Sequence, residues 1–425
     1  MSAAVFFVLP ISLLAIGTPI FATLMVATCT GIMLLGDAPL RAVHTAMFGS
    51  LDAFALLAVP LFILAGDIMA KGGIAQRLIE LVMSVVGGVR GSLPLATIGS
   101  ASVFGAMSGS SVACVAAIGK LTLPSLEKSG YGRIFGVSLV TATGVIDVII
   151  PPSIPMIIYA IAAQQSVTEL FLAGIVPGLI VASALAIYVV IRSRLQGIPS
   201  GAPPRREAVV RAAKRSVWAL LAPILILGGI YGGVFTPTEA AGIACVYSAV
   251  VSVLIHREMT LADLWKTVLD SSVLVAQIMI VVSAAGAYAW LITTSGLPQG
   301  LVAFIDKLGL ETWLLLLVLN VLLLVVGSVL EPPAAILVLA PLLTPIAAQA
   351  GVDPLHFGII VTVNLAIGMF MPPFGLNLFA AHAIFKTPLP ELYRGVVPFF
   401  LIYLGILMLL TYVPALTLAP VALFR

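Results

Sequence analysis

A pattern of proline and glycine residues between residues 123 and 177 recurs 221 residues later, and this duplication limits the possible folds more than any other feature. A repeat of this size means that one structural unit occurs twice in the chain. The first copy contains Leu123-Pro124, Gly130, Pro151-Pro152, Gly174 and Pro177, and the second contains Thr344-Pro345, Gly351, Pro372-Pro373, Gly395 and Pro398.

The composition places this duplication in a membrane. Of 425 residues, 61% are hydrophobic and only 9% are charged, and the mean hydropathy is +1.22. Apolar runs of roughly 18 residues, enough to cross a bilayer, recur from end to end. These features predict an all-α polytopic membrane protein that is surrounded by the lipid bilayer. No basic tract interleaved with aromatic residues indicates a nucleic-acid partner, and Cys29, Cys114 and Cys245 form no CxxC pair.

Hydropathy predicts five crossing segments in each half of the chain. They lie near residues 2–16, 18–36, 50–70, 133–165 and 168–192, and near 216–235, 238–256, 269–294, 355–385 and 394–420. Between the third and fourth segment of each half lies an apolar stretch, about 91–126 and about 311–348, with a break at its middle. Such short arms around small, polar or proline residues favour a re-entrant hairpin. A pair of full crossings, or one kinked helix, is the alternative for each stretch.

Because five is an odd number, the second half must start on the opposite side of the membrane, so the two repeats are expected to be inverted. The first repeat covers 1–192, a linker covers 193–215 and the second repeat covers 216–425. Sixteen Lys and Arg residues fall on the side of the linker, whereas Arg41, Lys307 and Arg425 fall on the other side. Positive residues prefer the cytoplasm, which predicts a cytoplasmic linker and two outer termini. Residues 197–204 are too rich in Pro and Gly to be helical.

Each half also contains a Pro-Pro pair inside an apolar segment, at Pro151-Pro152 and Pro372-Pro373. Proline removes a backbone donor and frees the carbonyl four residues earlier. We therefore expect two broken helices, about 133–165 and about 355–385, with bare carbonyl oxygens that suit a cation. A Pro-Pro kink that serves geometry alone is the competing interpretation.

The middle of each hairpin carries a different set of residues. The first tip, Ser108-Gly109-Ser110-Ser111, offers hydroxyl oxygens and a residue without a side chain, as a hard monovalent cation requires. The second break runs from Gly327 through Ser328 to Glu331, and the repeat aligns Glu331 with Ser110. Small-residue tips also serve helix packing in membranes, which is the alternative.

Ionisable and amide side chains inside the membrane indicate functional sites, because burying them there is costly. Because a duplicated membrane fold usually means transport, Asp147 and Glu331 are the strongest candidates for a transport site, followed by Lys120 in the return arm of the first hairpin. Asp67 ranks lower because Lys71 is a plausible interfacial partner. Asn364 and Asn377 flank the second break. Two roles are open for each amide: it binds the substrate, or it satisfies a freed carbonyl.

An enzyme has little support. His44 and His256 are expected at loop ends, and His356 and His382 near the ends of the second broken helix, so none forms a recognisable catalytic pair. The chain contains no HExxH, GxSxG or GxxxxGK[ST] motif. An intramembrane enzyme is therefore a remote alternative.

Together these motifs resemble the large membrane subunit (DctM type) of the TRAP (tripartite ATP-independent periplasmic) transporter family. The resemblance covers essentially the whole chain. It runs through Phe104-Gly105-Ala106-Met107-Ser108-Gly109-Ser110-Ser111-Val112-Ala113, Ile150-Pro151-Pro152-Ser153, Phe235-Thr236-Pro237-Thr238-Glu239-Ala240-Ala241 and Met371-Pro372-Pro373-Phe374-Gly375-Leu376-Asn377.

The resemblance implies a Na+-driven importer of a small carboxylate in the bacterial inner membrane. It implies an elevator, in which a transport domain slides against a scaffold domain. A small four-helix membrane subunit and a periplasmic substrate-binding protein are the implied partners. A stand-alone ion-coupled carrier or antiporter is the nearest alternative, and a channel is a further one.

The resemblance also implies the site residues. One sodium site would involve Ser108, Ser110 and Ser111, with carbonyls around Gly144, Asp147 and Pro151. The other would involve Gly327, Ser328 and Glu331, with carbonyls around Gly368 and Met371. The substrate would meet Ser108, Asp147, Glu331 and Asn377.

Overall fold

The structure is a computed structural model that describes residues 4–35, 39, 41–200 and 203–424. In this part of the chain the regular structure is helical. The α-helices are α1 Leu9–Ala15, α2 Ile20–Leu35, α3 Arg41–Leu51, α4 Ala58–Lys71, α5 Ile74–Val85, α6 Ser92–Ser108, α7 Ser111–Lys128, α8 Arg133–Thr143, α9 Ile146–Ile149, α10 Ile154–Ala162, α11 Val167–Leu195, α12 Arg206–Arg215, α13 Val217–Tyr231, α14 Pro237–Val250, α15 Leu261–Thr294, α16 Leu297–Leu308, α17 Thr312–Val329, α18 Pro332–Gln349, α19 Pro354–Gly368, α20 Leu376–Phe385, α21 Leu389–Tyr412 and α22 Ala415–Phe424.

The helices confirm an all-α polytopic membrane protein. Among the described residues, seven helices are long and apolar enough to cross a membrane, or up to nine if each of two bent pairs is one span. The first two predicted crossings form α1 and α2, which are shorter than a full span. The predicted segment 394–420 divides into α21 and α22. The division falls next to Pro414, which lacks the backbone donor that a continuous helix needs.

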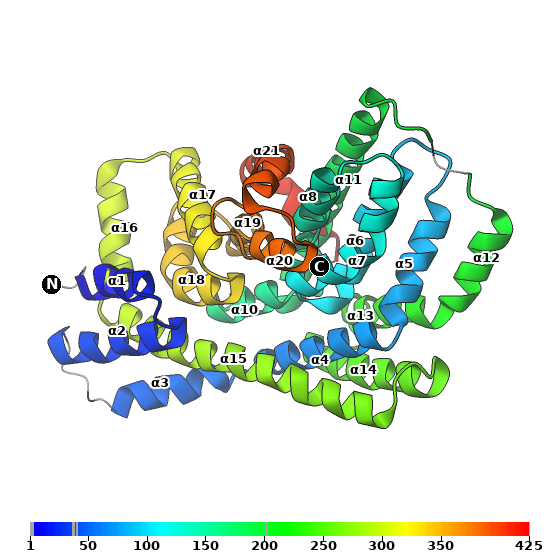
Figure 1. Cartoon of the computed structure of the whole chain (residues 1–425). Helices are drawn as coiled ribbons and strands as arrows, with labels where there is room; N and C mark the ends of the chain where they lie inside the picture. Colours follow the sequence, from blue (N-terminus) through cyan, green and yellow to red (C-terminus); the bar gives the residue numbers. More distant parts are fainter. Residues whose placement is uncertain (1–3, 36–38, 40, 201–202, 425) are drawn as a thin grey trace.

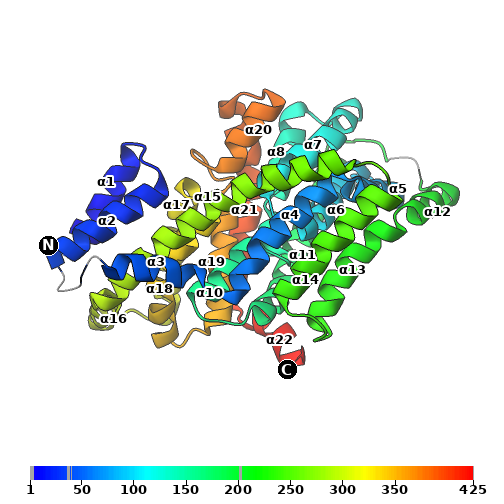
Figure 2. The same cartoon turned by 90° about the horizontal axis from the view of Figure 1, so that it is seen from below.

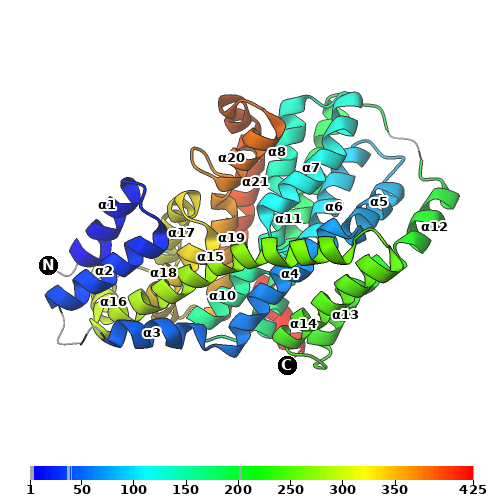
Figure 3. The same cartoon turned by 60° about the horizontal axis from the view of Figure 1, so that its bottom comes forward.

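The helices form two parts. A lower layer consists of α2, α3, α4, α14 and α15, in which the long α15 contacts α2, α3 and α4, and α14 packs along α4. Figure 1 shows this layer running beneath the remaining helices, and Figures 2 and 3 show α15 crossing the molecule in front of them. An upper body consists of α6 to α10, α17 to α20 and the long helices α11 and α21. The two parts meet where α4 and α15 reach α6, α10 and α18.

The two predicted hairpin stretches are both helix pairs with a turn at the predicted break. In the first, α6 and α7 pack against each other, and Gly109 turns the chain with φ +59°, a conformation that favours glycine. In the second, α17 packs mainly on α19, whereas α18 packs on α15 and α10. By length and composition α17 and α18 could each cross a membrane alone, which is the alternative stated above for this stretch.

Both Pro-Pro pairs interrupt helices, as predicted. The first broken segment comprises α8, α9 and α10, and the two main pieces bend by 42°. In the second, α19 ends at Gly368 and α20 begins at Leu376. Both Pro-Pro peptide bonds are cis.

Several helices lie outside the predicted segments. The short helices α5 and α16 precede the two hairpins, and the last ten residues of the 193–215 linker form α12. The α11 helix also continues to Leu195, inside the predicted linker. The expectation that residues 197–204 are not helical agrees with the described residues of that range. His44 lies within α3, so the expected loop position was wrong.

The α17 and α19 helices approach closely because glycine faces glycine. A Cβ atom on Gly368 would lie 2.2 Å from the carbonyl carbon of Gly327, and backbone atoms have no rotamer with which to move away. The last turn of α19 therefore sits directly on the end of α17, immediately before the second tip.

Replacing Gly368 with alanine should separate these two helices. Overpacking of this kind costs about 1–3 kcal/mol, so the apparent melting midpoint of the detergent-purified protein should fall by several degrees. The matched control is Gly405→Ala in α21, where an added Cβ would meet nothing within 4 Å. Equal midpoints for the two variants would contradict the close approach.

Candidate functional site

Both hairpin tips and both helix breaks line one cavity of about 240 Å³. This volume is slightly below the roughly 300–1,000 Å³ of pockets for drug-sized ligands, so it suits a small metabolite. The α4 and α15 helices of the lower layer close it through Ile63, Asp67, Leu274 and Ile278. The upper body contributes Ser110 and Ser111 of the first tip, Val148 and Ile154 of the first break, Glu331 and Pro332 of the second tip, and Met369 and Leu376 of the second break.

Four helices begin at this cavity. The first residues of α7, α10, α18 and α20 are in its lining, and these are Ser111, Ile154, Pro332 and Leu376. The N-terminus of a helix carries a partial positive charge. Backbone donors are fewer here, because α18 begins with two prolines and the Asn377 N–H of α20 already bonds to Met369. The partial charges still favour an anionic group without any basic side chain.

Ser111 joins the first tip to both breaks. Its hydroxyl donates to the carbonyl oxygen of Gly144 at 3.0 Å, and the Asn377 side-chain amide donates to the same hydroxyl at 2.5 Å. The amide also approaches the Thr141 carbonyl oxygen at 3.5 Å. Three of the predicted site residues, from α7, α8 and α20, thus form one polar cluster.

Three of the four carbonyls that the prolines free accept hydrogen bonds, whereas the carbonyl of Asp147, which Pro151 frees, has no hydrogen-bond partner among the described residues. Pro152 frees the carbonyl of Val148, which accepts a hydrogen bond of 2.5 Å from the Ser153 hydroxyl. In the second break, Pro372 and Pro373 free the carbonyls of Gly368 and Met369. These accept from the backbone N–H groups of Met371 at 3.1 Å and Asn377 at 2.8 Å.

The other unsatisfied oxygens near the breaks belong to side chains. Both carboxylate oxygens of Asp147 are buried without a partner, as are the amide oxygens of Asn364 and Asn377. Asp147 is only 1% exposed and packs tightly on α6. A Cβ atom added to Gly105 of α6 would lie 2.5 Å from the Cβ atom of Asp147. Buried acceptors without donors cost free energy, and a bound cation would remove that cost.

The oxygens here suit a hard monovalent cation better than a transition metal. Among the described residues, no group of three or more His, Cys, Asp and Glu side chains gathers at one point. Carbonyl, hydroxyl and carboxylate oxygens are the ligands of hard cations. Ser111, Gly144, Asp147 and Asn377 therefore fit the predicted ion in chemistry.

The second tip is not built like the first. The Ser328 hydroxyl donates to the Val325 carbonyl of its own helix at 2.7 Å, and Gly327 is covered by Gly368. Glu331 lies at the start of α18 and lines the cavity. The Ser108 side chain lies outside the described residues, although its backbone ends α6. Pro151 is buried within the first break, and Met371 contributes a backbone bond to the second.

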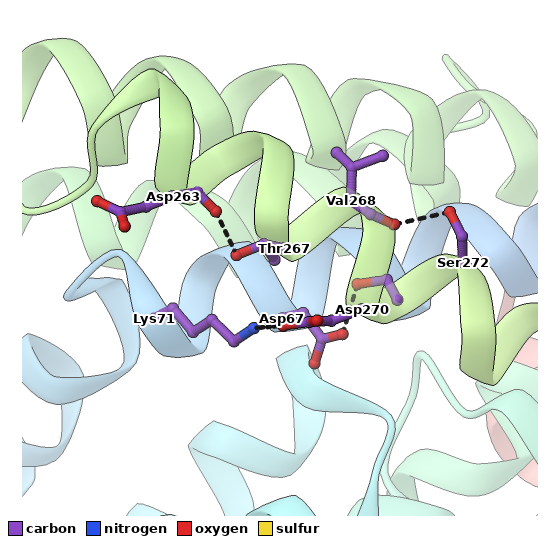
Figure 4. Close-up of polar contacts among 8 residues, drawn as sticks. Asp67, Lys71, Asp263, Thr267, Val268, Asp270 and Ser272 are labelled. Carbon is purple, nitrogen blue, oxygen red and sulfur yellow. Dashed lines mark hydrogen bonds and ion pairs between the residues drawn. The ribbon is translucent and has the colours of Figure 1, made fainter.

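Asp67 proves more central than the sequence suggested, because Lys71 is not its partner. The Lys71 ammonium pairs with Asp270 at 3.0 Å, and the Asp67 carboxylate instead accepts a hydrogen bond of 2.6 Å from Ser271. Figure 4 shows both aspartates at the junction of α4 and α15. Asp67 therefore faces the cavity, whereas the exposed Lys120 is absent from its described lining.

Asn364 belongs to a separate polar network that the sequence analysis missed. Its amide donates to the Asn320 side-chain oxygen at 2.7 Å, and the Asn320 amide donates to the Thr411 hydroxyl at 3.0 Å. His356 adds contacts from its two ring nitrogens to Thr417 and to the Thr411 backbone. The available signal was Asn320 itself, a lone amide in the middle of an apolar helix.

A larger groove of about 840 Å³ lies on α13 and α14, but its chemistry is different. Its lining is almost entirely apolar, with residues such as Trp218, Phe235 and Val246. The carboxylate of Glu239, also in the lining, already caps the start of α14 through Thr236. The groove therefore resembles a lipid-facing surface, and the polar groups gather in the smaller cavity.

Comparison with known proteins agrees with this architecture. Residues 7–416 match the family described as the tripartite ATP-independent periplasmic transporter, DctM component. The C4-dicarboxylate TRAP transporter large permease protein DctM of Pseudomonas aeruginosa is 40% identical over 388 residues, which are 91% of each chain. The ectoine/5-hydroxyectoine TRAP transporter large permease protein UehC of Ruegeria pomeroyi is 37% identical over 98% of each chain.

Two further similarities concern chain length and fold. The isethionate TRAP transporter permease protein DctMQ of Oleidesulfovibrio alaskensis is 39% identical over 95% of this chain, which spans 64% of that protein. The crystal structure of the Alcanivorax borkumensis YdaH transporter has a TM-score of 0.66 and 16% identity, and the alignment covers 93% of this chain and 97% of that one. The family match over nearly the whole chain and these identities show that the protein belongs to the DctM family, as a TRAP transporter large permease of the bacterial inner membrane.

Proposed function

We propose that this chain imports a small carboxylate together with sodium, by an elevator movement, after a periplasmic binding protein has delivered the substrate. The observation that carries the proposal is the single cavity to which both tips and both breaks contribute. A compact site formed by two broken helices and two tips suits alternating access better than a channel, which needs a continuous polar lining.

The anionic end of the substrate is assigned to the helix N-termini. Four helices begin at the cavity, and no basic residue is in its described lining. Helix ends bind carboxylates through backbone N–H groups. Three relatives are named for C4-dicarboxylates, isethionate and ectoine. Each of these compounds carries an anionic group, although they differ in other respects.

Sodium is assigned to the first tip and first break. Ser111 hydrogen-bonds both the Gly144 carbonyl and the Asn377 amide, and Asn377 and Asp147, in the same body, carry buried oxygens without a partner. A bound cation supplies the positive charge that these oxygens lack. For the second site, Gly327 and Ser328 with the carbonyls of Gly368 and Met371 remain the proposed ligands, and Glu331 is assigned to the substrate because it lines the cavity.

The elevator movement is supported by where the cavity lies. It sits at the boundary between the lower layer, proposed as the scaffold, and the upper body, proposed as the transport domain. The polar contacts described above join helices within one part, such as Lys71 to Asp270 or Asn377 to Ser111. At the cavity the lower layer presents mainly apolar side chains, including Ile63 and Ile278, and apolar surfaces can slide without breaking hydrogen bonds.

Loss of a tip hydroxyl should weaken sodium binding. Ser111→Ala and Ser110→Ala should each raise the sodium concentration for half-maximal uptake about fivefold, since one such contact contributes about 1 kcal/mol. Uptake is measured in proteoliposomes that contain the complete system. The control is Ser102→Ala, whose hydroxyl donates only to its own helix at Ile98. Unchanged sodium dependence in both tip variants, or full uptake in a sodium-free proton gradient, would refute the coupling.

The chain should require its partners. This chain matches 64% of the DctMQ relative, whose remaining length leaves room for a further membrane component, and this supports a small membrane subunit as a partner. In proteoliposomes with a sodium gradient, the chain alone should show little uptake of any candidate carboxylate. Adding the small subunit and the loaded binding protein should restore uptake. Full-rate uptake by the lone chain would favour a stand-alone carrier.

A further inference from the structure

The cavity has an unusual balance of charge for a carboxylate transporter. Asp67 and Glu331 are the charged residues of its described lining, and no Lys, Arg or His accompanies them. They approach from opposite parts of the molecule, since Asp67 lies on α4 of the lower layer and Glu331 begins α18 of the upper body. The cavity therefore holds two negative groups and four positive helix ends.

The Asp67 carboxylate is held in place without a neutralising cation. Ser271 donates to one of its oxygens at 2.6 Å, and this serine is itself buried between α4 and α15. The nearest cation along the helix, Lys71, is turned to Asp270 at 3.0 Å (Figure 4). A hydrogen bond from a hydroxyl leaves the negative charge of Asp67 uncompensated on the cavity wall.

These charges discriminate between two kinds of small carboxylate. Helix N-termini attract one carboxylate group, but a second one would meet Asp67 and Glu331, and like charges repel. A molecule with one carboxylate and one cationic nitrogen satisfies both sets of groups. Unfavourable contacts with the wrong ligand are a common source of specificity.

We infer that the cavity selects a small zwitterion over a dicarboxylate, with the cationic group between Asp67 and Glu331 and the carboxylate at the helix ends. This inference rests on the proposed function and narrows its substrate class. Sequence identity does not decide between a dicarboxylate and a zwitterion as the substrate, because the relatives named for C4-dicarboxylates and for ectoine are 40% and 37% identical to this chain.

Direct binding to the membrane complex tests the inference without the selectivity of the binding protein. The chain is purified with its small subunit in nanodiscs at saturating sodium. Calorimetry then measures the affinities for three zwitterions, ectoine, proline and glycine betaine, and for succinate. At least one zwitterion should bind more tightly than succinate. Asp67→Asn should lower the affinity for that zwitterion about tenfold and leave the affinity for succinate equal or higher. Glu331→Gln should change both affinities in the same direction.

The control is Glu80→Gln, which removes a negative charge on α5 outside the cavity lining and should leave both affinities unchanged. Melting midpoints establish that each variant is folded. Tighter binding of succinate than of all three zwitterions would overturn the inference while leaving carboxylate transport standing. If Asp67→Asn lowered the affinity for zwitterions and for succinate equally and raised the sodium requirement, the acids would belong to sodium binding, and the inference would be overturned as well. Failure of every carboxylate to bind would refute the proposed function itself.

Discussion

Every break in a membrane helix leaves carbonyl oxygens that lipid cannot hydrogen-bond, and the rest of this structure depends on how they are satisfied. Around the first break the donors are side chains from four different helices or helix starts. The bonds run from Asn377 to the Thr141 carbonyl, from Tyr403 to Ala142, from Ser111 to Gly144 and from Ser153 to Val148. Satisfying the break therefore also ties α7, α20 and α21 to it, so that the first tip is fixed against both breaks.

At the second break the freed carbonyls are satisfied by backbone N–H groups rather than by side chains. Gly368 lies against Gly327, and the freed carbonyls of Gly368 and Met369 bond to nearby backbone N–H groups. The two halves thus use different chemistry at corresponding places, although Pro-Pro pairs interrupt both helices. An arrangement of this kind leaves Glu331 as the polar side chain of the second tip, whereas the first tip offers hydroxyls.

The tips and breaks were predictable because Pro, Gly and Ser act locally, whatever the fold around them. The partner of Asp67 could not be predicted from the sequence, because Ser271 lies 204 positions away and only the packing of α4 on α15 brings the two residues together. Local spacing instead suggested Lys71, one turn along the same helix. The short helices α5 and α16 were missed since they are too brief to give a crossing signal. The bare-carbonyl prediction failed at Val148 because Ser153 follows the prolines and its hydroxyl donates to that carbonyl.

The position of the two acids has a consequence for movement. Asp67 belongs to the lower layer and Glu331 to the upper body, while the four helix ends that would hold a carboxylate all belong to the upper body. A sliding upper body would carry the carboxylate site and Glu331 with it and leave Asp67 behind. A cationic group held by both acids would then lose one of its two partners, since Coulomb attraction falls with distance. The affinity for such a substrate would then differ between the two positions of the upper body, because only one of them brings Asp67 and Glu331 to the same cavity.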